Sequence, residues 1–168
     1  MQVSTKGLNL IKKYESLKLK AYLDVVKILT IGYGTTNSVL PDGHKITINS
    51  VWTEKEADYW LDYAINQVFL PSMVKYIKVD LTQDQFDAVV CFVYNCGLGN
   101  FISSTLLKKI NLKDFDGAQK EFLKWNRAQG KVLRGLTRRR LEEAVFFGSA
   151  TREELIEDCL DGVYPEIK

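Results

Sequence analysis

The spacing of apolar residues changes twice along the chain, and these changes limit the folds that the chain can adopt. Leu8, Ile11 and Glu15 follow the spacing of one helix face. Residues 18–48 instead combine alternating apolar and polar residues, β-branched residues and glycine, which favour strands and turns. They include a turn at "PDG" and another alternating stretch after it, which is expected to belong to the same sheet. From Thr53 onward the spacing is helical again. One helix, a small antiparallel sheet and a helical majority predict an α+β fold that is mostly helical.

Capping residues indicate where the helices begin. Ser4 or Thr5 can cap the first helix, which is expected to end near Glu15. The capping-box segments "TEKE", "TQDQ" and "TREE" predict helices after Thr53, Thr82 and Thr151. Pro71 is expected to kink the first of these, and "NCGLGN" is expected to break the chain. Further helices are expected from about Ser103 and over Leu112–Trp125, Thr137–Phe147 and Thr151–Leu160.

Composition and charge exclude several classes of protein. The chain has 168 residues, which suits one compact domain, and its net charge of +2 does not indicate nucleic-acid binding. No apolar stretch approaches the roughly 20 residues that span a bilayer. The N-terminal residues show no signal peptide, so we expect a protein that is made in the cytoplasm.

Metal and disulfide chemistry are not expected. Cys91, Cys96 and Cys159 are odd in number and form no CxxC pair. Cys91 lies in an apolar run, where a buried, reduced and structural cysteine is expected. The only histidine, His44, follows a turn-like "PDG" and is expected to be an exposed loop residue. No His and Cys cluster has the spacing of metal ligands.

Glu15 occupies an apolar position near the end of the first helix. Apolar neighbours and the negative end of the helix dipole both favour a protonated carboxyl group, whereas Lys12, Lys13 and Lys18 oppose this. A carboxyl group that is protonated near neutral pH can act as a general acid. The alternative is a surface glutamate at a frayed helix end, which the pattern alone leaves open.

Asp24 lies nine residues after Glu15. One helix would place two side chains at this spacing on opposite faces, so the chain must leave the helix and run back as a strand to bring them together. Asp24 then lies at a turn, where it has a second interpretation as a residue that binds its own backbone. Thr30 can hold a water molecule through its hydroxyl, or can simply be a good strand former.

The spacing of Glu15, Asp24 and Thr30, followed directly by "IGYG", resembles that of the phage-type lysozymes, glycoside hydrolase family 24. The segments "QFDAVVCFVYNCGLGNFISSTLLKKIN" and "GLTRRRLEEAVFF" resemble the same family. The resemblance extends from about Leu8 to Gly148. One departure is that this chain has Thr35 where many members have histidine, which affects no member of the catalytic set.

The resemblance implies a bilobal lysozyme fold within a single domain of residues 1–168. Residues 13–60 would form a small β-containing lobe and residues 61–168 a helical lobe, on which the N-terminal helix can pack. A long helix near Thr53–Lys78 would join the two lobes, with substrate bound between them.

The resemblance also implies roles for individual residues. Glu15 would be the general acid, Asp24 the second carboxylate and Thr30 the residue that positions water. The implied substrate-binding residues are Tyr94, Asn95 and Ser104. Glycosidic cleavage needs a proton for the leaving oxygen and an anion near the developing oxocarbenium ion, which two carboxylates can supply. Direct attack by water with inversion and a closer carboxylate pair with retention are both open.

The implied function is that of a muramidase, which hydrolyses the β-1,4 bond between N-acetylmuramic acid and N-acetylglucosamine in peptidoglycan. As a phage or prophage endolysin it would act as a monomer and wait in the host cytoplasm until a holin-type pore releases it to the cell wall. No cofactor, metal, nucleic acid or stable membrane insertion is expected. The competing hypothesis is a non-catalytic module that binds glycans or anions, but the complete set of Glu15, Asp24 and Thr30 favours an enzyme.

"TRRRLEE" raises the separate question of an anion site. Arg138, Arg139 and Arg140 could bind anionic envelope polymers or nucleic acid. Adjacent helical residues point about 100° apart, so the three side chains do not form one patch. A solvated helix start is favoured, with one arginine packing locally or pairing with Glu142 or Glu143.

Overall fold

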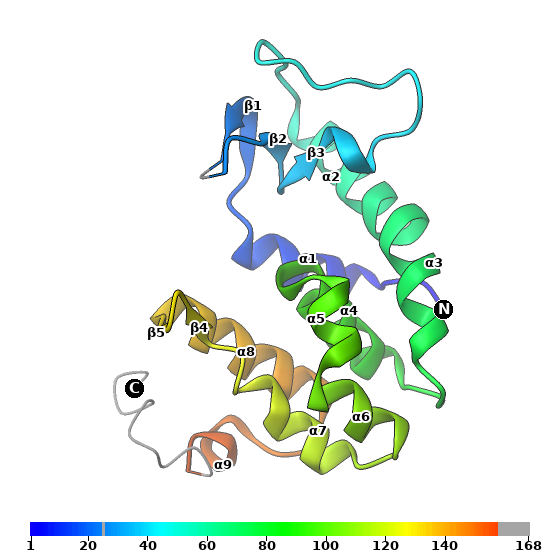
Figure 1. Cartoon of the computed structure of the whole chain (residues 1–168), viewed down its shortest axis with the longest axis vertical. Helices are drawn as coiled ribbons and strands as arrows, with labels where there is room; N and C mark the ends of the chain where they lie inside the picture. The colour runs from blue at the N-terminus through cyan, green and yellow to red at the C-terminus, as the bar shows by residue number, and fades with distance from the viewer. Residues whose placement is uncertain (25, 158–168) are drawn as a thin grey trace. The chain divides into compact units, whose positions relative to one another are not determined.

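The computed structural model describes residues 1–24 and 26–157. The chain divides into two compact units (Figure 1). The N-terminal unit comprises Gln2–Ser72, and the C-terminal unit comprises Met1 together with the residues from Met73 onward. Among the described residues, none of the helices combines the length and the apolar composition that a bilayer span requires.

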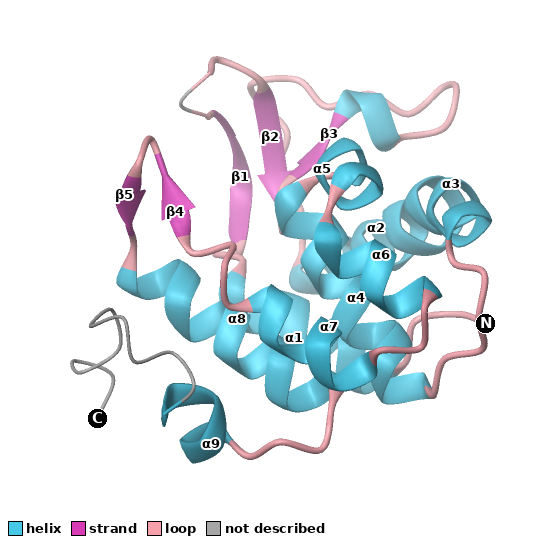
Figure 2. Ribbon diagram, turned by 60° about the horizontal axis from the view of Figure 1, so that its bottom comes forward, coloured by secondary structure: helices cyan, strands magenta, loops and turns pink. Residues whose placement is uncertain are grey.

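The N-terminal unit begins with a helix and continues into a small sheet. Its first elements are α1 (Thr5–Tyr14), β1 (Lys18–Leu23), β2 (Leu29–Gly32), β3 (Thr35–Thr36) and the 3₁₀ turn η1 (Asn37–Val39). The Ser4 side chain caps α1 by accepting a hydrogen bond from the Gly7 N–H. The strands form an antiparallel sheet in the order β1-β2-β3 (Figure 2), which confirms the predicted change from helix to sheet.

The alternating stretch after "PDG" does not form a strand of this sheet, so that part of the prediction was wrong. The Asn37 side chain takes the place of a strand partner. Its Oδ1 accepts from the Ile46 N–H at 2.6 Å, and its Nδ2 donates to the Ile46 carbonyl at 3.1 Å. Ile46 is buried, which explains why this loop is held close to the unit.

A continuous helical segment follows over the range of the long helix expected near Thr53–Lys78, and it is irregular just before Pro71. It consists of α2 (Glu54–Tyr63), the π-helical turn η2 (Ala64–Phe69), α3 (Leu70–Met73) and the 3₁₀ turn η3 (Val74–Tyr76). Pro71 lies in α3 directly after the π-helical turn. Proline has no N–H to donate to the preceding turn, and a locally wider turn accommodates it without ending the helix.

The C-terminal unit is mainly helical. Its elements are α4 (Gln83–Cys96), α5 (Leu98–Ser103), α6 (Thr105–Asn111), α7 (Phe115–Phe122), β4 (Arg127–Ala128), β5 (Lys131–Val132), α8 (Arg134–Phe147) and α9 (Arg152–Glu157). Helix α4 packs against α8, and α7 packs against both α6 and α8. Phe92 lies at the centre of this core, with the rings of Phe101, Phe122 and Trp125 in edge contact.

The predicted helix starts are largely confirmed in both units. Thr53 with Glu56 and Thr82 with Gln85 form complete capping boxes, and Thr151 with Glu154 makes the same pair of bonds. Gly97 ends α4 with a φ of 85°, as expected of a break, whereas Gly99 lies within α5. The β4–β5 hairpin was not predicted. Cys159 and Leu160, named in the predictions, lie outside the described residues.

Candidate active site

Glu15 lies where the chain leaves α1. The helix ends at Tyr14, and the Glu15 N–H donates to the Ile11 carbonyl at 3.0 Å while its own backbone is already extended. The side chain is half-buried. On the predicted apolar stripe, Ile11 is fully buried and Leu8 is half-buried, and the other buried positions of α1 are Gly7 and Leu10.

The last turn of α1 is fixed to α2 by an ion pair. The Lys12 Nζ lies 2.6 Å from the Asp58 Oδ1, and the same ammonium lies 5.6 Å from the centre of the Tyr33 ring. Burial and the nearby Asp58 carboxylate raise the pKa of Tyr33. Lys12 is therefore paired with Asp58 and holds the end of α1 in place, three residues before Glu15. Its charge is not simply an unpaired positive charge next to Glu15.

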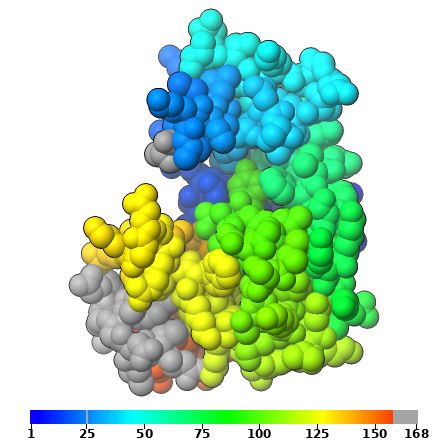
Figure 3. All heavy atoms as spheres, viewed as in Figure 1, coloured from blue at the N-terminus to red at the C-terminus, as the bar shows by residue number. Residues whose placement is uncertain are grey.

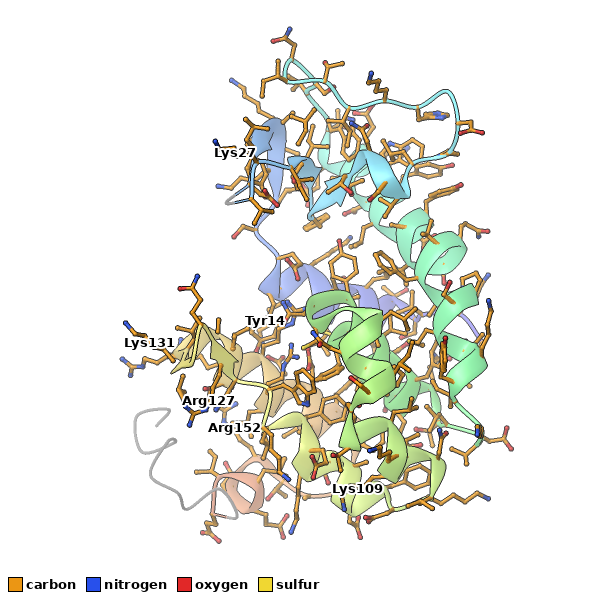
Figure 4. All side chains as sticks on the ribbon, in the orientation of Figure 1. Tyr14, Lys27, Lys109, Arg127, Lys131 and Arg152 are labelled. Carbon is orange, nitrogen blue, oxygen red and sulfur yellow. The ribbon has the colours of Figure 1, made fainter. Side chains whose placement is uncertain are left out.

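Asp24 directly follows β1 and organises the turn to β2. Its Oδ1 accepts two backbone hydrogen bonds, from the Val26 N–H at 2.9 Å and from the Ile28 N–H at 2.8 Å. The Lys27 N–H donates to the Asp24 carbonyl, and Lys27 itself has a φ of 63°. Lys27 is labelled in Figure 4, and the turn lies on the surface of the N-terminal unit (Figure 3). Asp24 thus has the turn role that was its second interpretation.

Thr30 is joined to Asp24 through one backbone carbonyl. The Ile28 oxygen accepts from the Asp24 N–H at 3.0 Å and from the Thr30 hydroxyl, also at 3.0 Å. Thr30 is buried in β2, where it pairs with Tyr22 on one side and Thr36 on the other. The structure therefore brings Asp24 and Thr30 together around Ile28, a residue that no sequence pattern selects.

The three expected substrate-binding residues lie in the C-terminal unit. Tyr94 and Asn95 belong to the last turn of α4, where Tyr94 is half-buried and Asn95 is exposed. Ser104 is buried and caps α6, since its hydroxyl donates to the Phe101 carbonyl at 2.7 Å and accepts from the Leu107 N–H at 3.0 Å. These bonds give Ser104 a structural role whatever else it contacts.

A buried cluster of charges joins α4 to α8, and it corrects the prediction for "TRRR". Arg139 and Arg140 are 3% and 0% exposed, and both bind the Glu143 Oε1, at 3.1 Å and 2.9 Å. A solvated helix start was therefore the wrong interpretation for two of the three arginines, and only Arg138 is exposed. Glu143 is also fully buried, and burial raises its pKa although both arginines act to lower it.

The cysteines and the histidine occupy ordinary positions. Cys91 is buried as predicted, and its thiol lies 3.1 Å from the Glu143 Oε1. Burial raises the pKa of this thiol well above its usual range. His44 is exposed as predicted, and its ring makes an edge contact with Trp60. Within residues 1–24 and 26–157, no group of His, Cys, Asp and Glu side chains is arranged to hold a metal ion.

Comparison with known proteins decides the family. The Phage lysozyme family matches residues 12–143, which include Glu15, Asp24, Thr30 and the buried charges of α8. The chain belongs to the phage lysozyme family. It is a lysozyme-type glycoside hydrolase with a lysozyme fold, as the resemblance implied.

Individual relatives of this lysozyme extend the match. The endolysin of Bacillus phage B103 is 46% identical over 149 residues, which cover 88% of this chain and 54% of that protein. The endolysin of Acyrthosiphon pisum secondary endosymbiont phage 1 is 44% identical, with 89% and 100% of the two chains covered. A solved variant of P22 lysozyme superposes with a TM-score of 0.79 at 31% identity, covering 89% of this chain and 99% of the other.

Proposed function

We propose that this lysozyme is a phage endolysin that hydrolyses the β-1,4 bond between N-acetylmuramic acid and N-acetylglucosamine in bacterial peptidoglycan. The observation that carries the proposal is the β1–β2 turn, in which Asp24 and Thr30 are tied to the same Ile28 carbonyl. A turn built in this way holds a carboxylate and a hydroxyl as one unit. Family membership supplies the reaction class, and this unit supplies a carboxylate and a hydroxyl for the water that attacks the sugar.

Glu15 is assigned as the general acid. It leaves α1 at a position that the Lys12–Asp58 pair holds in place, and its side chain is neither fully buried nor fully exposed. A glutamic acid at such a position can reach a substrate oxygen and still be shielded from bulk water on one side. It would donate its proton to the glycosidic oxygen as the bond breaks.

Asp24 and Thr30 are assigned to the water that attacks the sugar. The Thr30 hydroxyl donates its single proton to the Ile28 carbonyl, so toward a water molecule its oxygen acts as an acceptor. The Asp24 Oδ1 is engaged with two N–H groups, which fixes the carboxylate and directs the remaining oxygen to other partners. A water that donates to both residues would keep a lone pair free for attack, which favours direct displacement with inversion.

The identity of the new chain end tests the function. Peptidoglycan digested with the wild-type enzyme is reduced with borohydride and hydrolysed, and the reduced sugars are identified. A muramidase gives reduced muramic acid, whereas cleavage of the other glycosidic bond would give reduced glucosamine and would refute the assignment. The Glu15→Gln protein is the control, since it keeps the size of the side chain without a useful proton.

The competing function, a glycan-binding module without catalysis, is tested by the same digestion. Such a module would sediment with cell walls but release no new reducing ends. The proposed enzyme releases them in amounts that increase with time and exceed the amount of protein. Tyr94 and Asn95 are proposed to contact the glycan strand, because they lie on the accessible part of the last turn of α4.

We also propose that the enzyme accumulates in the host cytoplasm as a monomer and reaches the wall through a holin-type pore. In the N-terminal unit, Val3, Leu10 and Ile11 are buried, so these apolar side chains take part in folding. Expression in the cytoplasm alone should leave the culture intact, and co-expression of a holin should clear it. Lysis without any pore-forming protein would contradict this route.

A further inference from the structure

One hydrogen bond connects the buried charges of α8 to the exposed end of α4. The Arg140 Nη2 donates to the Asn95 side-chain Oδ1 at 3.0 Å. Arg140 is 0% exposed, whereas Asn95 is exposed, so the bond runs from the core of the C-terminal unit to its surface. The contact joins residues that are 45 positions apart in the sequence.

This bond fixes which way the Asn95 amide faces. A guanidinium group has only donors, so the atom that meets Arg140 must be the amide oxygen. The amide nitrogen, with two N–H donors, is then turned away from the guanidinium. Asn95 therefore offers hydrogen-bond donors at the surface, although an asparagine without such a partner could present either end.

The charged groups next to Asn95 also favour its role as a hydrogen-bond donor. Arg140 carries a permanent positive charge and shares the Glu143 carboxylate with Arg139. The other groups that contact Arg140 are uncharged: the Cys96 thiol at 2.7 Å and the Phe92 ring, whose centre lies 5.0 Å away. Burial raises the pKa of the Cys96 thiol, which keeps it neutral. The Arg140 guanidinium thus places a positive charge directly behind Asn95, and an electron-rich oxygen beside Asn95 is favoured.

We propose that Arg140 is a positioning residue, which holds Asn95 so that its amide N–H groups donate to a carbonyl oxygen of the wall polymer. The proposal rests on the proposed function. It adds that Asn95 is the donor in this contact and that Arg140 determines the orientation of the Asn95 amide. Acetamido groups of the glycan and amides of the peptide both offer such an oxygen. Arg140 itself would not touch the substrate.

Arg139 provides a matched control. It binds the same Glu143 oxygen as Arg140, but its Nη2 lies 3.3 Å from the Cys91 carbonyl, whereas Arg140 binds Asn95. Arg139→Lys and Arg140→Lys should both lower the unfolding midpoint, because each removes part of a buried network. Only Arg140→Lys should alter substrate binding through Asn95.

The experiment is a double-mutant cycle with steady-state kinetics on soluble peptidoglycan fragments. Arg140→Lys is expected to raise KM about 10-fold with little change in kcat, in line with the loss of one charge-assisted hydrogen bond. In the Asn95→Ala background the same change should alter KM less than about twofold, because the two residues act through one contact. Asn95→Asp should raise KM while the protein stays folded, since a carboxylate accepts from Arg140 but cannot donate to a carbonyl.

Three outcomes would overturn the proposal. An equal rise of KM in Arg139→Lys and Arg140→Lys would show a structural effect only. An undiminished effect of Arg140→Lys in the Asn95→Ala background would show that the arginine acts elsewhere. A normal KM for Asn95→Asp would exclude the donor role.

Two further measurements separate this proposal from the proposed function. Sedimentation of all variants with intact walls ranks binding even where no cleavage occurs, so loss of wild-type activity alone would refute only the proposed function. Glycan strands from which an amidase has removed the peptides distinguish the two acceptors. A KM defect that persists on these strands assigns the acetamido group, and one that disappears assigns the peptide.

Discussion

Asp24 in the β1–β2 turn and Glu143 on α8 are both carboxylates with several hydrogen-bond partners, yet they are held in opposite ways. Asp24 is half-buried and accepts from two neutral backbone N–H groups. Glu143 is fully buried and is bound by two cationic side chains. The turn of Asp24 holds its carboxylate through neutral donors, whereas two positively charged arginines bind the carboxylate of Glu143.

The two carboxylates therefore have different functions in the enzyme. A carboxylate held by its own turn keeps its charge available for chemistry, and its turn can survive the loss of that charge. A carboxylate buried with arginines stabilises the packing of two helices, and removal of either partner leaves a charge without compensation. Substitutions in the turn should therefore affect activity, and substitution of Glu143 should mainly affect stability.

Asp24→Asn should give the largest loss of activity without loss of the fold. An asparagine oxygen can still accept from the Val26 and Ile28 N–H groups, so the turn is kept while the charge is removed. The rate of wall cleavage should fall roughly 10²–10⁴-fold, the usual contribution of a catalytic acid or base. Asp42→Asn, in an exposed loop, is the control and should be fully active. An active Asp24→Asn enzyme would show that the charge of the turn is not used.

A pair of substitutions at Thr30 sharpens the comparison within the turn itself. Thr30→Ser keeps the hydroxyl and its bond to Ile28, and activity should change less than about threefold. Thr30→Val has nearly the same shape without the hydroxyl, and the loss of one hydrogen bond to the attacking water predicts a decrease of about 10-fold or more in kcat. Initial rates on soluble fragments measure both. Equal rates for the two variants would place Thr30 outside the reaction.

Substitutions in the capping boxes of the two units should have the smallest effect, which is a change in how stability depends on pH. Glu56 closes the box at α2, and the hydrogen bonds from Thr53 lower the pKa of its carboxyl group below the ordinary 4.5. The ionised Glu56 carboxylate therefore contributes its full stabilisation when the pH is above the ordinary pKa. This contribution is lost as the pH falls through the lowered pKa of Glu56 in the folded protein. Gln85 closes the equivalent box at α4 and does not titrate.

Thermal unfolding between about pH 2.5 and 7 tests this difference. Glu56→Gln should reduce the acid sensitivity of the unfolding midpoint, and Gln85→Glu should increase it. Both proteins should match the wild type closely at pH 7. Parallel curves for all three proteins would show that the boxes do not contribute through ionisation.

Much of the fold follows from local sequence signals. Ser4, Thr53, Thr82 and Thr151 each begin a helix, because capping depends on residues only a few positions apart. The loss of the expected strand near Ile46 depends instead on the side chain of Asn37, which no periodicity reveals. The β4–β5 hairpin was missed because its strands have two residues each, too few to show alternation.

The candidate site shows the same limit. The residue types and spacing of Glu15, Asp24 and Thr30 could be read from the sequence, and the family match includes all three. The Ile28 carbonyl, which joins two of them, is a backbone atom, and backbone atoms leave no compositional signal. Burial of Arg139 and Arg140 could not be predicted either, since it depends on Cys91 and Asn95 of a helix more than 40 residues earlier.

The most direct test of the account measures catalysis and stability on two glutamates that receive the same substitution. Glu15→Gln should lower kcat by roughly 10²–10⁴-fold and leave the unfolding midpoint near that of the wild type. Glu143→Gln should lower the free energy of unfolding by about 3–5 kcal/mol and keep a nearly normal rate at a temperature where it remains folded. A Glu15→Gln enzyme that cleaves walls at the wild-type rate, or a folded Glu143→Gln enzyme that does not cleave them, would contradict the central claim.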